Sequence, residues 1–124
     1  MYRFAIKNRI YNDKTVGYLY YEEDTQTYKI EIPDDVKSFE APLILSDFIQ
    51  KGERKIGNEW SLRWVQGRVV PPERQNIGQI LKNNGMKFYS EFPLLVKSQG
   101  RCCQDECYIE QISDYNSEYD FLNE

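Results

Sequence analysis

The sequence contains no histidine. That absence excludes Ser-His-Asp and Cys-His catalysis, and it removes the usual zinc-binding sets that combine cysteine with histidine. The three cysteines, at positions 102, 103 and 107, include no Cys-x-x-Cys pair. An odd and clustered set argues against a disulfide framework and favours small buried apolar side chains. We therefore predict a chain that is not an enzyme and that binds no metal or cofactor.

Long apolar runs are also missing. No run approaches the roughly 18 residues of a membrane span, and the N-terminus lacks an apolar segment of signal-peptide length. A soluble, cytoplasmic protein without membrane contact is the expectation. The 124 residues suffice for one domain with an ordinary core. Aromatic residues make up 15% of the chain, and ten are tyrosines, which suit half-buried or contact surfaces.

The net charge of −4 is concentrated at the C-terminus. Residues 113–124 carry four acidic side chains and no basic one, whereas residues 1–112 hold 16 of each sign. Because residues 1–112 carry no net charge, they produce no overall positive potential that would attract phosphate backbones. This argues against direct binding of nucleic acid. Residues 113–124 are predicted to form a flexible acidic tail. Tyr119 and Phe121 leave open a second interpretation, in which the tail docks on a partner protein.

Residue patterning predicts the α+β class. Alternating apolar and polar residues indicate strands over 2–8, 16–23 and 26–32, which form a three-stranded antiparallel β-meander with one face in water. Helical spacing then predicts about four short helices: between 42 and 52, over 60–66, between 72 and 83, and between 90 and 100. Residues 53–58 are expected to be polar and mobile. Residues 104–112 are expected to return as a strand at the edge of the meander.

One domain is therefore expected over residues 1–112, with the meander in 1–32, the helical part in 42–99 and the return strand in 104–112. Gly78 lies inside the third predicted helix, where glycine costs about 1 kcal/mol relative to alanine. We interpret it as marking the close approach of another backbone. Asp105 is interpreted as tying the turn before the last strand, rather than as half of a catalytic carboxylate pair.

Residues 60–81 join two predicted helices through Pro71 and Pro72, and they contain both tryptophans. Tryptophan and arginine dominate binding hot spots, so this Trp/Arg corner is a candidate contact with a partner protein. The candidate residues are Trp60, Trp64, Arg68, Arg74 and Asn76. The alternative is internal, with the tryptophans in the core and the arginines bound to carbonyls and acids around the proline joint.

The corner belongs to a longer series of features: Trp60 and Trp64, then Arg68, Pro71, Arg74 and Asn76, then Gly85, Tyr89, Leu95, Gly100, Asp105 and Tyr108. This order resembles the N-terminal region of HipA-like serine/threonine kinases, the toxins of HipA-type toxin–antitoxin systems. The resemblance is specific over residues 60–109 and looser before them. It implies a stand-alone N-terminal subdomain that pairs with a separately encoded kinase, to which ATP and magnesium would belong.

From this resemblance we expect a non-catalytic binding or regulatory subunit, antitoxin-like or accessory, whose Trp/Arg corner and tail cover the active cleft of a HipA-like kinase. Two alternatives stay open. One is a phage or mobile-element protein that blocks a host enzyme. The other is a nucleic-acid-associated module that helps a DNA-binding antitoxin, with a basic face made of Arg54, Lys55, Arg63, Arg68 and Arg74.

Overall fold

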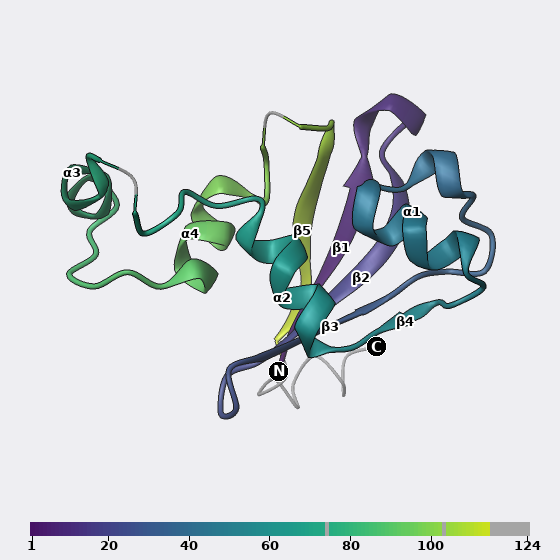
Figure 1. The fold of residues 1–124 in the computed structure, drawn as a ribbon, viewed down its shortest axis with the longest axis horizontal. Helices are drawn as coiled ribbons and strands as arrows, with labels where there is room; N and C mark the ends of the chain where they lie inside the picture. Colours follow the sequence, from purple (N-terminus) through teal and green to yellow (C-terminus); the bar gives the residue numbers. More distant parts are fainter. Residues whose placement is uncertain (74, 103, 115–124) are drawn as a thin grey trace.

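The computed structural model describes residues 1–73, 75–102 and 104–114. Five antiparallel strands form one sheet in the order β4-β3-β2-β1-β5 (Figure 1). They are β1 (Tyr2–Asn8), β2 (Lys14–Glu22), β3 (Thr27–Glu31), β4 (Lys55–Ile56) and β5 (Cys107–Asp114). The first three strands are the predicted meander. The predicted return strand is β5, which pairs with β1 at the edge of the sheet.

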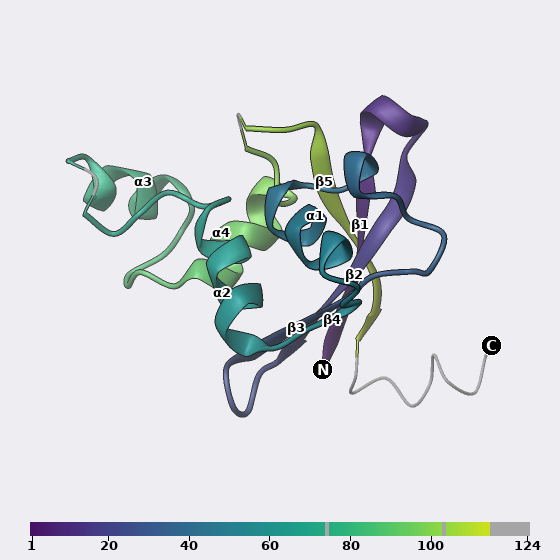
Figure 2. The same ribbon diagram turned by 45° about the vertical axis from the view of Figure 1, so that its right-hand side comes forward.

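Within the described residues, two 3-10 helices and four α-helices complete an α+β fold. They are η1 (Arg9–Tyr11), η2 (Ser38–Glu40), α1 (Leu43–Gln50), α2 (Asn58–Gln66), α3 (Ile77–Asn83) and α4 (Glu91–Ser98). Helices α1, α2 and α4 lie against one face of the sheet, whereas α3 stands away from the body (Figures 1 and 2). None of the helices in the described part of the chain has the length and apolar character needed to cross a membrane.

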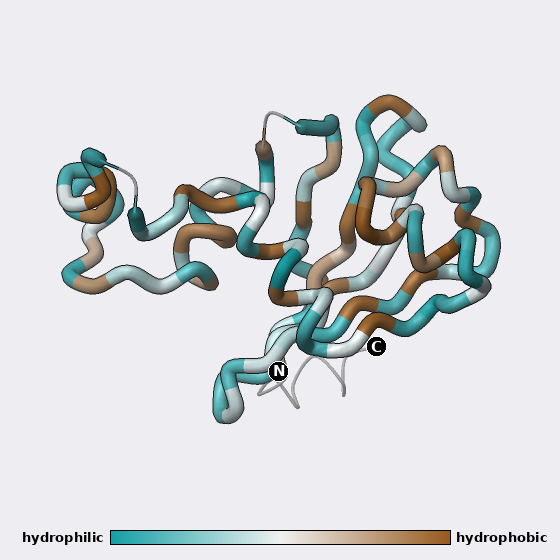
Figure 3. The backbone as a smooth tube through the Cα atoms, in the orientation of Figure 1, coloured by the Kyte–Doolittle hydropathy of each residue, from teal (hydrophilic) through white to brown (hydrophobic). Residues whose placement is uncertain are grey.

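The turn residues, together with the alternation of apolar and polar side chains, determine the register of the first hairpin. Asn12 and Asp13 have φ angles of 57° and 59°, in the left-handed region that these two residue types tolerate well. With this turn, Phe4 lies opposite Leu19 and Ile6 lies opposite Gly17. Alternate side chains of each strand thus point to the face that the helices cover, where they form the core. The hairpin that joins β2 and β3 is hydrophilic by contrast (Figure 3).

An aromatic cluster joins α4 to the sheet. The ring of Phe92 stacks on that of Tyr21, with 4.0 Å between centroids and 16° between planes. Its centroid also lies 5.2 Å from that of Tyr2 and 6.0 Å from that of Phe4. Aromatic pairs at these separations contribute about 0.5–1.5 kcal/mol beyond the area that they bury. Phe92 therefore helps to seat α4 on the sheet, together with the buried Leu95.

Residues 53–58 contradict the prediction of a mobile polar segment. Lys55 and Ile56 form β4, in which Ile56 is buried opposite Ile30. The Arg54 carbonyl accepts a hydrogen bond from the Ile32 amide at 2.8 Å. The Arg54 guanidinium also donates to the Pro33 carbonyl at 2.6 Å. One isoleucine among polar neighbours has no periodicity to detect, yet it fills one position on the covered face of the sheet.

The third helix also differs from the prediction. Pro72 does not open it, because α3 begins at Ile77 and Asn76 is its N-cap residue, without a side-chain capping bond. The interpretation of Gly78 is wrong as well, since no atom lies within 4 Å of the position that a β-carbon there would take. The physical reason is that α3 projects from the body, so no second backbone approaches it.

Replacing Gly78 with alanine is expected to stabilise α3 by about 0.5 kcal/mol, because alanine has the higher helix propensity and the added methyl group meets nothing. Amide hydrogen exchange in α3 should slow by about twofold. Gly17→Ala is the matched comparison. Its β-carbon would lie 3.0 Å from Leu45 Cδ2 and 3.3 Å from Ile6 Cδ1, so global stability should fall. Faster exchange in the Gly78 variant would contradict the projecting arrangement.

Candidate partner-binding surface

Arg68, two residues beyond α2, ties the helical layer to the loop between α4 and β5. Its side chain is buried, and its Nε donates to the Gly100 carbonyl at 2.6 Å. Nη1 donates to Asp105 Oδ2 at 3.1 Å, and Nη2 donates to Asp105 Oδ1. Nη2 also reaches the Cys107 carbonyl at 3.1 Å. This two-point pairing with a carboxylate holds together segments that lie 37 residues apart in the chain.

The electrostatics of Asp105 match this arrangement. Partial burial alone would raise the pKa of its carboxyl group, but hydrogen bonds from Arg68 and from the Cys107 amide outweigh that effect and lower the pKa. The amide bond, 2.9 Å from Cys107 N to Asp105 Oδ1, spans the turn that leads into β5. Asp105 therefore ties the turn before the last strand, as the sequence predicts.

Trp64 lies under this ion pair. It is only 3% exposed, and the Arg68 guanidinium carbon is 4.5 Å from the centroid of its ring. The indole N–H has no hydrogen-bond partner among the described residues. Packing and the cation above the ring therefore hold Trp64 in place. Of the two interpretations of Trp64 and Arg68, the internal one describes their contacts, although those contacts lie at the α4–β5 loop rather than at the proline joint.

From this anchor the chain leaves the body as residues 71–90, which we call the arm. The Tyr89 hydroxyl, near the end of the arm, donates to the Val70 carbonyl at 2.7 Å, so both ends of the arm are held together at its base. Helix α3 lies at the far end, away from the sheet, and α4 is the helix that it faces across a cavity (Figures 1 and 2). The arm is thus a projection with a closed base rather than an open linker.

The arm carries apolar side chains that the body covers only in part. Ile77, Ile80 and Leu81 form the apolar stripe of α3 at helical spacing, and α3 contains no buried residue. Between Ile80 and Leu94 of α4 lies a cavity of about 240 Å³, so the stripe is not packed tightly against the body. Phe88, farther along the arm, is 81% exposed. Partly exposed apolar side chains on a projecting segment are a feature of protein-binding sites.

Trp60 occupies a different place. It lies in the first turn of α2, whereas the arm follows the other end of that helix. Its ring is 42% exposed, makes an edge contact with Phe48 at 6.3 Å and lies 4.6 Å from the Arg63 guanidinium carbon. Trp60 is therefore a half-open aromatic surface beside α1. The structure does not bring Trp60 and the arm together.

The remaining candidate residues are divided between the surface and the part of the chain that is not described. Asn76 is exposed at the start of α3. Arg74, Tyr119 and Phe121 lie outside the described residues, and so does most of the predicted tail, although β5 extends to Asp114.

Sequence reasoning missed Phe88 as a surface residue. The available signal was its position three residues after Gly85, beyond the end of a helix, where no apolar repeat demands burial.

The basic face suggested for a nucleic-acid module does not assemble from its described members. The guanidinium of Arg54 is bound to carbonyls, and that of Arg68 is buried against Asp105. Arg63 lies over Trp60 and pairs with Glu59 at 3.6 Å, which leaves Lys55 as an exposed cation without such a contact. No observation on these residues favours direct binding to nucleic acid.

Cys107, at the start of β5, is a buried free thiol. Burial, together with the nearby charge of Asp105, raises the pKa of the Cys107 thiol to about 12. It is therefore protonated near neutral pH and is a poor nucleophile. No group of three possible metal ligands occurs within the described ranges. Cys107 instead fills a core position on the covered face of the sheet.

Comparison of the chain with protein-family models, with curated proteins and with solved structures gave no match. The resemblance to HipA-like kinases therefore rests on the sequence features alone. The geometry adds an independent feature, an apolar arm that projects from a base pinned by Arg68, Asp105 and Tyr89. That arm is the candidate partner-binding surface.

Proposed function

We propose that this chain is a non-catalytic binding and regulatory subunit, antitoxin-like or accessory, of a HipA-like kinase toxin–antitoxin system. Its partner is a separately encoded kinase. The single observation that supports a binding role is the arm, in which α3 stands away from the sheet with a half-exposed apolar stripe and Phe88 is exposed. The kinase identity of the partner comes from the order of features over residues 60–109.

The proposed contact uses the arm as a short helix in an apolar groove of the kinase. Anchors at i, i+3 and i+4, which Ile77, Ile80 and Leu81 provide, are the usual pattern for such recognition. Trp64 and Arg68 act indirectly, because they hold the base of the arm and are themselves buried. Trp60 and Asn76 remain candidate direct contacts. Restraint of the kinase is steric, with the arm covering or misaligning the active cleft.

Co-purification tests the proposal. The tagged chain is expressed with the neighbouring reading frames, and a kinase-sized partner should elute in a stoichiometric amount. Replacing Ile80 and Leu81 together with alanine should weaken binding by at least tenfold, since anchors in a central apolar contact contribute about 1–2 kcal/mol each. Added at a stoichiometric ratio, the unaltered chain should also lower the activity of the purified kinase.

The matched control is Gln79→Ala, which changes the polar side of the same helix, where Gln79 contacts only Asn83 at 2.8 Å among the described side-chain hydrogen bonds. It should leave partner binding within twofold of the unaltered chain. Gln79 is exposed, so Gln79→Ala should leave the melting temperature of the isolated chain unchanged, whereas the double variant, at two half-buried positions, should lower it by a few degrees without unfolding the chain. Failure to recover any kinase from the neighbouring reading frames would overturn the proposed function.

A further inference from the structure

The excess of positive charge in this chain is confined to the arm, α4 and the residues directly after α4. Residues 71–101 carry five basic and two acidic side chains, whereas residues 1–70 carry eleven of each and residues 102–124 carry seven acids and no base. Four of those five basic residues are described and exposed: Lys82, Lys87, Lys97 and Arg101. Every ion pair among the described residues lies outside residues 71–101. No ion pair within the described chain therefore compensates these four cations.

The cavity between the arm and α4 lies in this positively charged region. The aliphatic side chains that line it are Val69, Val70, Ile80 and Leu94. Its volume is about 240 Å³, and because a cavity of roughly 150 Å³ accommodates a benzene ring, a leucine or phenylalanine side chain fits inside. Two cations also line it. The Arg68 guanidinium is already bound to Asp105, so Lys97 is the cation that stays available there.

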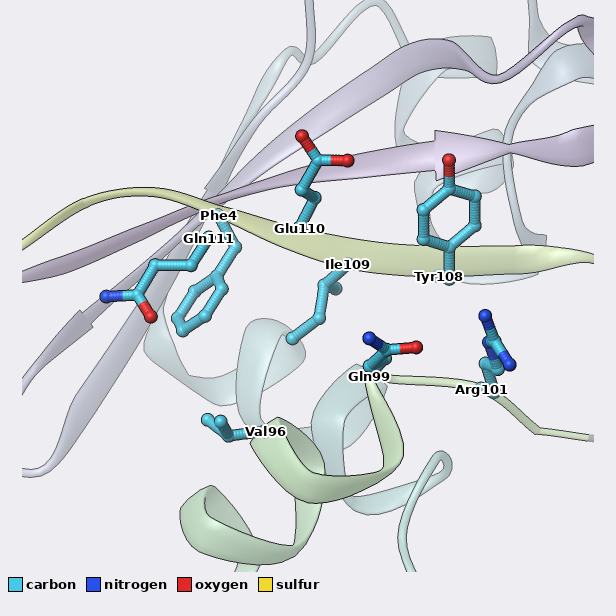
Figure 4. A pocket seen from close by; sticks show the side chains of 8 residues that line it. All are labelled: Phe4, Val96, Gln99, Arg101, Tyr108, Ile109, Glu110 and Gln111. Atoms are coloured by element: carbon cyan, nitrogen blue, oxygen red, sulfur yellow. The ribbon is translucent and has the colours of Figure 1, made fainter.

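Charge distinguishes this cavity from three other pockets that described residues line. The pocket on the side of α4 that faces β5 contains Arg101 but also Glu110 (Figure 4). The pocket beside α1 contains Lys51 and Asp47, and the pocket at the start of β5 contains two arginines and two acids. Acids and bases are therefore equal in number in each of these three. The cavity beside the arm is lined by two bases and by no acid.

We propose that this cavity binds an acidic and apolar segment of the partner protein. An apolar side chain of the segment enters between Ile80 and Leu94, and a neighbouring carboxylate pairs with the Lys97 ammonium. Lys82 and Lys87, on the same arm, add to the attraction, because opposite charges steer the encounter of two proteins. The inference rests on the proposed function, since it takes the arm as the binding surface. It adds that the kinase groove that receives the arm is bordered by acidic side chains.

An acidic polypeptide fits these observations better than a nucleic acid does. Single strands bind where their bases stack on aromatic rings, whereas the apolar walls of this cavity are aliphatic. Duplexes bind through many phosphate contacts, whereas Lys97 is the one free cation among the described residues that line the cavity. A polypeptide offers an apolar side chain and a carboxylate on neighbouring residues, which is the combination that the cavity and its lysine would accept.

Defined peptides test the inference on the full chain. The probes are fluorescent peptides with glutamate and serine on both sides of a central leucine or phenylalanine, and fluorescence anisotropy measures their binding. At least one should bind at low salt, and about 0.5 M salt should weaken the binding several-fold, because salt screens exposed charges. Replacing the central residue with alanine should weaken binding by about tenfold. Replacing the glutamates with lysines should weaken it by about tenfold or more.

Two variants of the chain test where the peptide binds. Lys97→Glu reverses the charge at the cavity and should weaken binding of the best peptide by about fivefold. Lys55→Glu is the matched control, because it makes the same change at an exposed lysine of β4, and its binding should stay within about twofold. Ser98 is exposed and lines the cavity, so Ser98→Trp should fill it without unfolding the chain and weaken binding by about tenfold.

Any of four results would overturn the inference. The first two are equal peptide binding by the unaltered chain and Lys97→Glu, and no binding of any acidic peptide at millimolar concentration. Tighter binding of an oligothymidylate than of the peptides would assign the lysines to nucleic acid. Stronger peptide binding by Phe121→Ala would assign the cavity to the acidic end of this chain. None of these results depends on recovering a kinase, so this inference and the proposed function can fail separately.

Discussion

Replacing Asp105 with alanine is expected to lower the free energy of unfolding by about 3 kcal/mol. The variant leaves the Arg68 guanidinium buried without its counter-ion, and breaking a buried pair in this way typically costs about 3–5 kcal/mol. Partial exposure of Asp105 places the expected value at the lower end of that range. Urea denaturation followed by tryptophan fluorescence measures it, because Trp64 lies directly under Arg68.

Glu106→Ala provides the matched control, since Glu106 is the adjacent acid and its side chain is exposed. It should change stability by no more than about 0.5 kcal/mol. If the two variants were equally stable, the ion pair between Arg68 and Asp105 would not form in solution. The base of the arm would then have to be held by Tyr89 alone.

The same ion pair should make the free energy of unfolding depend on pH. The pKa of Asp105 is lower in the folded state than its ordinary value of 3.8, so the unfolded state takes up a proton first as the pH falls. The stabilisation is fully present above pH 3.8 and is lost as the pH falls through the folded-state pKa. The difference in stability between the unaltered chain and Asp105→Ala should therefore shrink below that pH.

The second large effect is expected at Phe92. Phe92→Ala removes the ring that stacks on Tyr21 and contacts Tyr2 and Phe4, so α4 loses its aromatic contacts with the sheet. Truncation of a core phenylalanine costs about 3–5 kcal/mol, and the half-buried position of Phe92 places the expected loss near 3 kcal/mol. Thermal and urea denaturation of the purified variant measure the loss.

Phe88→Ala is the natural comparison, because it makes the same chemical change four residues earlier at a site that is 81% exposed. Its stability should stay within about 0.5 kcal/mol of the unaltered chain. If the proposed function holds, however, Phe88→Ala should weaken binding to the kinase. Equal destabilisation by the two variants would mean that the arm is packed against the body, contrary to its projecting position.

The strands illustrate what local sequence can predict. Alternation over 2–8, 16–23 and 26–32 identified β1, β2 and β3 within two residues at each end. Asn83, Asn84 and Gly85 correctly predicted the end of α3, and Gly85 takes the positive φ of 69° that glycine accommodates. These features depend on a few neighbouring residues. β4 escaped prediction because a two-residue strand has no period to recognise.

The side-chain environments required the tertiary structure. Trp60 and Trp64 lie one helical turn apart and look equivalent in sequence, yet one is half-exposed and the other is buried. The difference arises because α2 is seated on the sheet by Asn58, which accepts a hydrogen bond from the Tyr28 amide, and by Ser61, which donates to the Ile56 carbonyl. Those contacts set which side of α2 faces the core.

The sequence by itself determined the α+β class, the meander, the return strand and the limits of most helices, because periodicity and turn chemistry act over short stretches of chain. Only the tertiary structure decided the partner of Arg68, the projection of the arm and the cavity between the arm and α4. Each of these depends on packing between segments far apart in the chain. Arg68 and Asp105 are 37 residues apart, and no local pattern encodes their meeting.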